Sequence, residues 1–62
     1  MSKFEIPFGQ AAKEFYEIEG RYRALLHLTR LPTGLRKRIL DAANYAHHLA
    51  ILTEKEAQKH GN

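Results

Sequence analysis

Apolar side chains between about Gln10 and Arg30 recur at alternating intervals of four and three residues. This spacing is typical of a helix that packs lengthwise on another helix, because residues three and four apart share one face. We therefore predict a helix over residues 10–30. Gly20 lies mid-helix, where glycine costs about 1 kcal/mol relative to alanine, and indicates a bend or a close contact. The apolar positions are Ala11, Phe15, Ile18, Tyr22 and Leu25, with Leu26 and Thr29 beside them.

A second apolar pattern predicts a longer helix over about residues 33–60. Its seam comprises Leu35, Ile39, Ala42, Ala46, Leu49 and Thr53, which Ala43, Ala50 and Ala57 widen on one side. With the apolar residues further round, well over half of the circumference is apolar. Such a helix is normally buried, yet the chain offers only one other helix to cover it. We therefore predict that it also packs against another subunit, through Leu40, Ala43, Tyr45, Ala50, Ile51 and Leu52.

Residues 31–34 form the predicted turn between the helices. Pro32 disfavours helix at the residue before it, and Thr33 is a suitable N-cap for the helix that follows. An alternative is a separate short helix over residues 53–62, since the segment that starts at Thr53 fits a capping box. We favour one continuous helix because no glycine or proline interrupts residues 35–60. The predicted fold is an all-α hairpin of two long antiparallel helices that dimerises into a four-helix bundle.

Residues 1–9 follow a different pattern and are predicted to form an extended N-terminal arm. Phe4, Ile6 and Phe8 alternate with Lys3, Glu5 and Pro7, and this period of two is typical of extended chain. The arm either folds back over the open end of the hairpin, which we favour, or reaches a neighbouring subunit or the sheet edge of a partner.

With 62 residues and no cysteine, the chain forms one domain at most and has no disulfide or thiolate metal site. A core this small is marginal, and self-association is then the leading source of stability. No apolar run approaches the ~20 residues that span a bilayer, and the N-terminus has no stretch of signal-peptide type. We expect no membrane partner and a cytoplasmic location.

Residue chemistry argues against catalysis. The only serine is Ser2 and the only aspartate is Asp41, and the chain has no phosphate loop or nucleophile elbow. A two-helix chain also lacks the concave pocket that most active sites need. We expect no enzyme, cofactor, small-molecule substrate or metal site, because the four histidines lack ligand spacing. These histidines are His27, His47, His48 and His60.

Charge is concentrated at the turn. Residues 20–40 carry six cations and no acid: Arg21, Arg23, Arg30, Arg36, Lys37 and Arg38. Cations in the first turn of a helix oppose its dipole, and free backbone donors near Thr33 would favour an anion there. Two other interpretations stay open. The cations could neutralise the C-terminal end of the first helix, or the basic apex could pair with the acidic open end of a second, antiparallel hairpin.

The functional prediction is a small regulatory protein that binds a partner protein, as an inhibitor or adaptor of the kind that phages and plasmids encode. The basic apex would supply electrostatic contacts, and Tyr16 and Tyr45 would supply anchors. The first alternative is a regulator that binds RNA or DNA phosphates with the same apex, together with Arg21 and Arg23. The second is a structural assembly subunit. The layout resembles ROP-type bundles in architecture, but no residue motif indicates a family.

Overall fold

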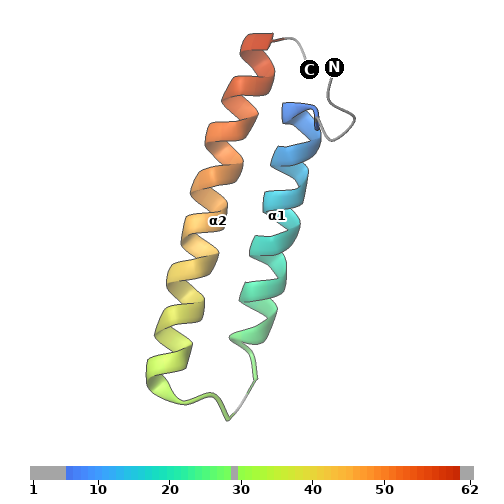
Figure 1. Cartoon of the computed structure of the whole chain (residues 1–62). Helices are drawn as coiled ribbons and strands as arrows, with labels where there is room; N and C mark the ends of the chain where they lie inside the picture. Colours follow the sequence, from blue (N-terminus) through green and yellow to red (C-terminus); the bar gives the residue numbers. More distant parts are fainter. Residues whose placement is uncertain (1–5, 29, 61–62) are drawn as a thin grey trace.

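The computed structural model describes residues 6–28 and 30–60. Two antiparallel helices, α1 (Phe8–Leu25) and α2 (Thr33–His60), pack against each other along their lengths (Figure 1). The predicted all-α hairpin is therefore confirmed. Most of the predicted N-terminal arm, residues 1–5, lies outside the described residues, as do Thr29 and residues 61–62. Neither helix is long and apolar enough to cross a membrane.

Helix α1 is shifted toward the N-terminus relative to the prediction. It begins at Phe8, because Pro7 adopts φ −57° and its carbonyl oxygen accepts a hydrogen bond of 3.0 Å from the Ala11 amide. Phe8 and Gly9, assigned to the extended arm, are thus helical. The helix ends at Leu25, five residues early. The amides of residues 26–28 each bond to the carbonyl three residues back at 3.1 Å, and this tighter pattern ends the α-helix.

Helix α2 spans the predicted residues without interruption. Its first helical bond runs from the Arg36 amide to the Pro32 carbonyl oxygen at 2.9 Å. Thr33 is therefore the first helical residue, not the N-cap. The alternative of a separate third helix is wrong, because α2 continues to His60. Thr53, the proposed cap of that helix, instead donates its hydroxyl hydrogen bond to the Leu49 carbonyl oxygen at 2.6 Å, a bond made inside a continuous helix.

The contact between the helices is built from alanines. The fully or nearly buried side chains among the described residues are Ala12 on α1 and Ala43, Ala46, Ala50 and Ala57 on α2. Ala43 and Ala50 are 0% exposed, so they pack inside the hairpin rather than on the outer interface to which the prediction assigned them. Small side chains let the two backbones approach closely. Consequently no large side chain in the described residues is fully buried.

Only part of the apolar stripe of α1 faces α2. Ile18, Tyr22 and Leu25 of this stripe are all exposed. The buried and half-buried positions of α1 are Ala11, Ala12, Phe15, Glu19 and Arg23, of which Ala11 and Phe15 belong to the stripe. The contact side is therefore rotated by roughly 70° from the middle of the stripe, at about 100° per residue.

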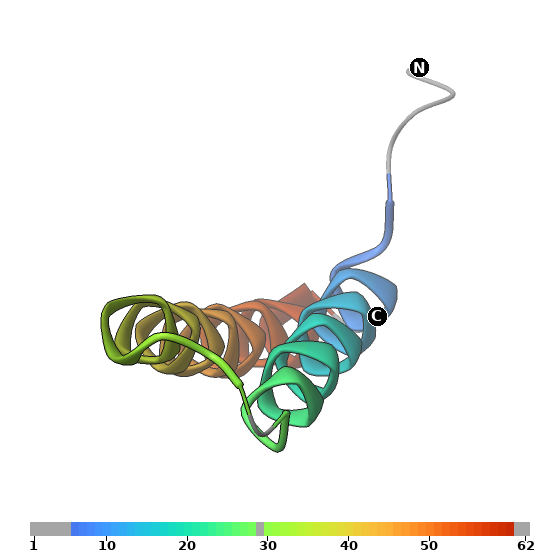
Figure 2. The same cartoon turned by 90° about the horizontal axis from the view of Figure 1, so that it is seen from below.

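The hairpin is a flat, single layer of helices. Its extents are 45 × 22 × 14 Å, and an end-on view shows the two helices side by side (Figure 2). The accessible surface is 5136 Å², against about 4,100 Å² expected for a folded monomer of this mass. Domains normally bury their apolar surface between two packed layers. One broad face of this layer is therefore expected to need a cover.

Gly20 has no close neighbour that would explain it. A Cβ atom built at this position meets nothing within 4 Å, so the close contact predicted as one reason for this glycine is absent. We expect Gly20→Ala to raise the free energy of unfolding by about 0.5–1 kcal/mol, because alanine loses less backbone entropy in a helix. Urea unfolding followed by circular dichroism measures this change. A loss of stability would indicate that Gly20 permits a bend in α1.

Candidate partner-binding surfaces

Arg36, at the centre of the predicted basic apex, is turned inward. Its guanidinium donates hydrogen bonds to the carbonyl oxygens of Leu26 at 2.6 Å and Leu28 at 3.0 Å. These carbonyls lie just beyond the end of α1, where backbone acceptors lack helical partners. Arg36 thus caps the preceding helix, as one of the two other interpretations of the apex supposed. Its charged group therefore stabilises the turn between the two helices.

Removing this cap should destabilise the hairpin. We expect Arg36→Ala to lower the free energy of unfolding by about 1 kcal/mol, the net value of partly exposed hydrogen bonds to a charged group. Chemical denaturation of the variant and of Lys37→Ala, its neighbour in the same turn, provides the comparison. Equal stability of the two variants would show that the Arg36 contacts contribute nothing.

The other predicted cations differ in how far they are paired. The Arg23 Nε lies 2.7 Å from the carboxylate of Glu19 on the same helix, and its Nη2 donates a hydrogen bond of 3.2 Å to the side-chain oxygen of Asn44 on α2. Lys37 lies 3.2 Å from Asp41, but both side chains are largely exposed, and such pairs contribute little. Within the described ranges, no ion pair involves the exposed residues Arg21, Arg30 and Arg38. Arg30, Lys37 and Arg38 therefore remain as the cations of the apex.

A hollow at the apex combines apolar and basic walls. Leu26 and Leu40 line it together with Thr33, Arg36 and Lys37, and its volume is about 320 Å³. The structure thus brings three residues of the predicted apex, and Leu40 of the predicted subunit interface, around one concavity. Arg21 and Arg23 lie on α1, outside this lining. The hollow could accept an apolar side chain whose neighbours carry negative charge.

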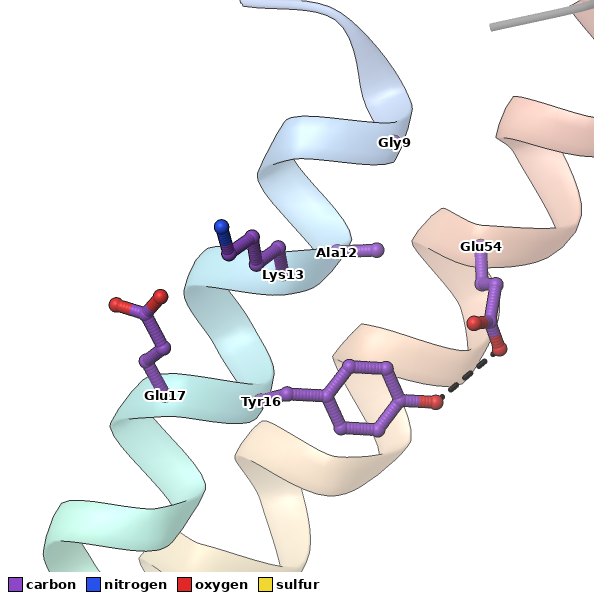
Figure 3. A pocket seen from close by; sticks show the side chains of 6 residues that line it. All are labelled: Gly9, Ala12, Lys13, Tyr16, Glu17 and Glu54. Atoms are coloured by element: carbon purple, nitrogen blue, oxygen red, sulfur yellow. Dashed lines mark hydrogen bonds between the residues drawn. The ribbon is translucent and has the colours of Figure 1, made fainter.

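A polar network crosses the hairpin on one side. The Glu19 carboxylate accepts the Arg23 Nε hydrogen bond and lies 2.9 Å from Nδ1 of His47. Further along, the Tyr16 hydroxyl donates to Glu54 at 3.1 Å (Figure 3). These partners are 28 and 38 residues apart in the chain, so no local pattern could have identified them. Tyr16, predicted to be a free anchor, is engaged inside the chain.

The network shifts the acid–base behaviour of two groups. The pKa of Glu19 is lowered, mainly by the hydrogen bond with His47 and then by the one with Arg23. The pKa of the Tyr16 hydroxyl is raised, first by desolvation and then by its hydrogen bond to Glu54. The largest cause of the Glu19 pKa shift and the hydrogen bond that contributes to the Tyr16 pKa shift are both contacts between α1 and α2.

The lowered pKa of Glu19 predicts an acid-sensitive hairpin. A carboxyl whose pKa is lower in the folded state stabilises that state above its unfolded pKa, and this gain is lost as pH falls through the folded value. The unfolded reference is 4.5, so the loss should occur below that pH. We expect Glu19→Gln to be less stable at neutral pH and to lose less stability on acidification. Parallel urea titrations test this, and identical losses in both chains would contradict it.

A second hollow lies beside Tyr16 and has mostly polar residues in its lining. This hollow of about 400 Å³ is lined by Gly9, Ala12, Lys13, Tyr16, Glu17 and Glu54. Lys13 and Glu17 extend away from α2, whereas Tyr16 reaches across to Glu54 (Figure 3). No three potential metal ligands cluster in the part of the chain that the structure describes. The groups are consistent with a helix-to-helix clamp.

Apolar residues of both helices occupy the opposite broad face. At the open end, Phe8 also stacks on His60 with ring centres 5.5 Å apart. Ile6, Phe8, Ala11 and Phe15 line one groove with Leu52, Thr53 and Glu56 of α2. At about 100° per residue, the remaining apolar positions of the α1 stripe and the apolar positions on the same side of α2 continue this face toward the apex. We call it the apolar face: Phe8, Ala11, Phe15, Ile18, Tyr22 and Leu25 of α1, and Ala42, Tyr45, Leu49 and Leu52 of α2.

The predicted subunit interface is thus split between surfaces. Tyr45, which is 64% exposed, and Leu52 belong to the apolar face. Leu40 lines the apex hollow, and it lies with Ile51 roughly 120° round α2 from Tyr45, at about 100° per residue.

No protein-family model matches this chain, and no curated protein or solved structure is significantly similar to it.

Proposed function

We propose that this chain is a non-enzymatic regulatory protein that binds a partner protein and acts as an assembly of hairpins, a dimer being favoured. The observation that carries the proposal is the single-layer fold, which leaves a whole apolar face uncovered. Monomeric proteins rarely expose an apolar patch of this extent without a binding role. The exposed apex would then contact the regulated partner.

The apex hollow favours a protein partner over nucleic acid. Leu26 and Leu40 offer apolar contact beside the exposed cation Lys37, a combination suited to an acidic segment with an apolar side chain. A phosphate backbone would use the cations alone. Because Arg36 and Arg23 are engaged within the chain, few cations are left for phosphates, whose binding strength rises with each contact.

Two alternatives make different demands on the surface. A regulator that binds RNA or DNA phosphates would still use Arg30, Lys37 and Arg38, and its affinity would fall steeply with added salt. A structural assembly subunit would need only the apolar face. Its behaviour would not depend on the apex.

The test is affinity capture from the source cell with matched charge-reversal variants. The apex variant is Arg30→Glu with Lys37→Glu. The control is Lys13→Glu with Lys55→Glu, which makes the same charge change near the open end of the hairpin. A protein that is retained after nuclease treatment, by the wild type and the control but not by the apex variant, would support the proposal.

Other outcomes separate the alternatives. Capture that disappears with nuclease, together with a steep salt dependence on purified RNA or DNA, would replace the proposal with the phosphate-binding function. Equal capture by the apex variant and the wild type would remove the apex as the binding site. Absence of any captured molecule by an assembled chain would favour the structural subunit.

A further inference from the structure

We propose that a second copy of this chain covers the apolar face in antiparallel orientation, so that the apex of each hairpin lies beside the open end of the other. This inference rests on the proposed function only in taking the assembly of hairpins as its starting point. It adds the face that is used, the orientation and the residues that determine it.

The side of the hairpin that holds the apolar face is large enough for a stable dimer. The broad side of the whole hairpin measures 45 by 22 Å, an outline of about 1,000 Å², and a standard protein interface buries about 800 Å² on each partner. Six residues of the apolar face are exposed, from Phe8 and Leu52 at the open end to Leu25 near the apex, and the other four are half-buried. A second copy would supply the missing layer with the same flat apolar surface.

Charges at the two ends of the apolar face determine the orientation. Arg38 and Glu56 of α2 are 18 residues apart, which is five full helical turns at about 3.6 residues per turn, so both lie on the same side of α2. Glu56 lines the groove of the apolar face. The residue midway between them is His47. If α2 pairs antiparallel with its copy about this midpoint, each Arg38 meets Glu56 of the second copy.

The opposite orientation loses this match. With both hairpins pointing the same way, the two apices would adjoin, and their cations would repel one another. In its own chain Glu56 lies 3.5 Å from Lys59 and 4.0 Å from His60. Both are loose, exposed pairs, so Glu56 can also accept a contact from Arg38.

The same axis predicts which residues of α1 approach their own copies. Because Glu19 of α1 contacts His47 of α2 at 2.9 Å, a two-fold axis level with His47 passes close to Ile18. In a two-fold interface, residues near the axis meet the same residues of the partner. Ile18 should therefore face Ile18 of the second copy, and Leu25 should face Ala11 of the second copy, because both lie seven residues from Ile18.

A charge-swap experiment tests the orientation. We expect Arg38→Glu and Glu56→Arg each to raise the dimer dissociation constant about tenfold, since each places like charges together at two symmetric sites. The double variant should return to within about threefold of the wild type. Sedimentation equilibrium measures all four proteins. Lys37→Glu, a charge reversal in the neighbouring position, should leave the constant unchanged.

Loss of helix would not explain such a result. An acid near the start of α2 and a base near its end both suit the helix dipole, so each single variant should keep or gain helicity. A wild-type dimer whose single variants are unaffected, or whose double variant remains as weak as the singles, would overturn the proposed orientation. A wild-type monomer at high micromolar concentration would overturn the pairing altogether.

Disulfide trapping tests the same geometry independently, because the chain has no native cysteine. Ile18→Cys should cross-link to its own copy under oxidation. Leu25→Cys should cross-link to Ala11→Cys in a mixture but not to itself, since antiparallel copies of residue 25 lie well beyond the ~7 Å Cα limit for a disulfide. An antiparallel dimer that captures no partner would remove the proposed function alone, whereas a monomer that captures one would remove this inference together with the assembly of hairpins and leave the partner-binding role.

Discussion

Ile18→Asp is expected to abolish dimerisation and most of the helical structure at micromolar concentration. Ile18 lies in the middle of the apolar face and is already exposed in the isolated hairpin, so the substitution removes no intrachain core. In the dimer it would bring two carboxylates together in an apolar contact, and each buried charge costs several kcal/mol. We expect the dissociation constant to rise at least ~1,000-fold, equivalent to about 4 kcal/mol.

The measurement combines sedimentation with thermal unfolding followed by circular dichroism. The wild-type melting temperature should rise with protein concentration, because association stabilises only the folded state. The variant should show no such dependence. Leu40→Asp is the matched control, since Leu40 is comparably exposed but lines the apex hollow on another side of α2. Equal loss of the dimer in both variants would show that the apolar face is not the interface.

Ala50→Leu should produce the second large effect, through the contact between α1 and α2. Ala50 is 0% exposed, and a leucine there would force the two helices apart. Overpacking of this kind costs about 1–3 kcal/mol, a large share of the stability of so small a domain. Urea unfolding should show a lower midpoint with an unchanged slope. Ala24→Leu, at an exposed position of α1, should be nearly neutral, and similar losses in both variants would contradict this account.

The second helix could be predicted well because its boundaries have strong local causes. Pro32 prevents helix before Thr33, and no glycine or proline interrupts the apolar pattern that follows. The end of α1 lacked such a signal. Residues 26–30 include ordinary helix formers, and α1 stops where the backbone bonds shorten to three-residue spacing and Arg36 caps the carbonyls. That capping contact depends on the turn being folded.

The partners of the apolar residues were predicted less well than the residues themselves. Periodicity identified the α1 stripe and the alanines of α2, but it carries no information on which surface packs inside the hairpin. The prediction placed the stripe inside and Ala43 and Ala50 outside, whereas Ile18, Tyr22 and Leu25 of the stripe are exposed and both alanines are buried. The close approach expected of the alanines thus occurs within the chain, and the larger apolar side chains are left on the outside.

The sequence allowed us to predict the cluster of cations at the candidate site but not the positions and contacts of their side chains. The cluster of cations at the turn was evident, but the separate roles of Arg36, Lys37 and Arg38 depend on side-chain contacts made after folding. The clamp formed by Tyr16, Glu19 and their α2 partners joins residues far apart in the chain. Pairwise contacts at such separations have no periodic signature.

The flat shape of the hairpin has a consequence for the size of any assembly that it forms. In the described residues one broad face is apolar, whereas the other carries charged and hydrogen-bonded groups such as Lys13, Glu17 and Glu54. Pairing through the proposed two-fold axis would therefore cover the apolar face of both copies, and the assembly would close at two. If both faces were apolar, the same layer could stack without limit into a filament. The polar face that carries the Tyr16–Glu54 hydrogen bond would therefore also prevent further copies from adding to the dimer.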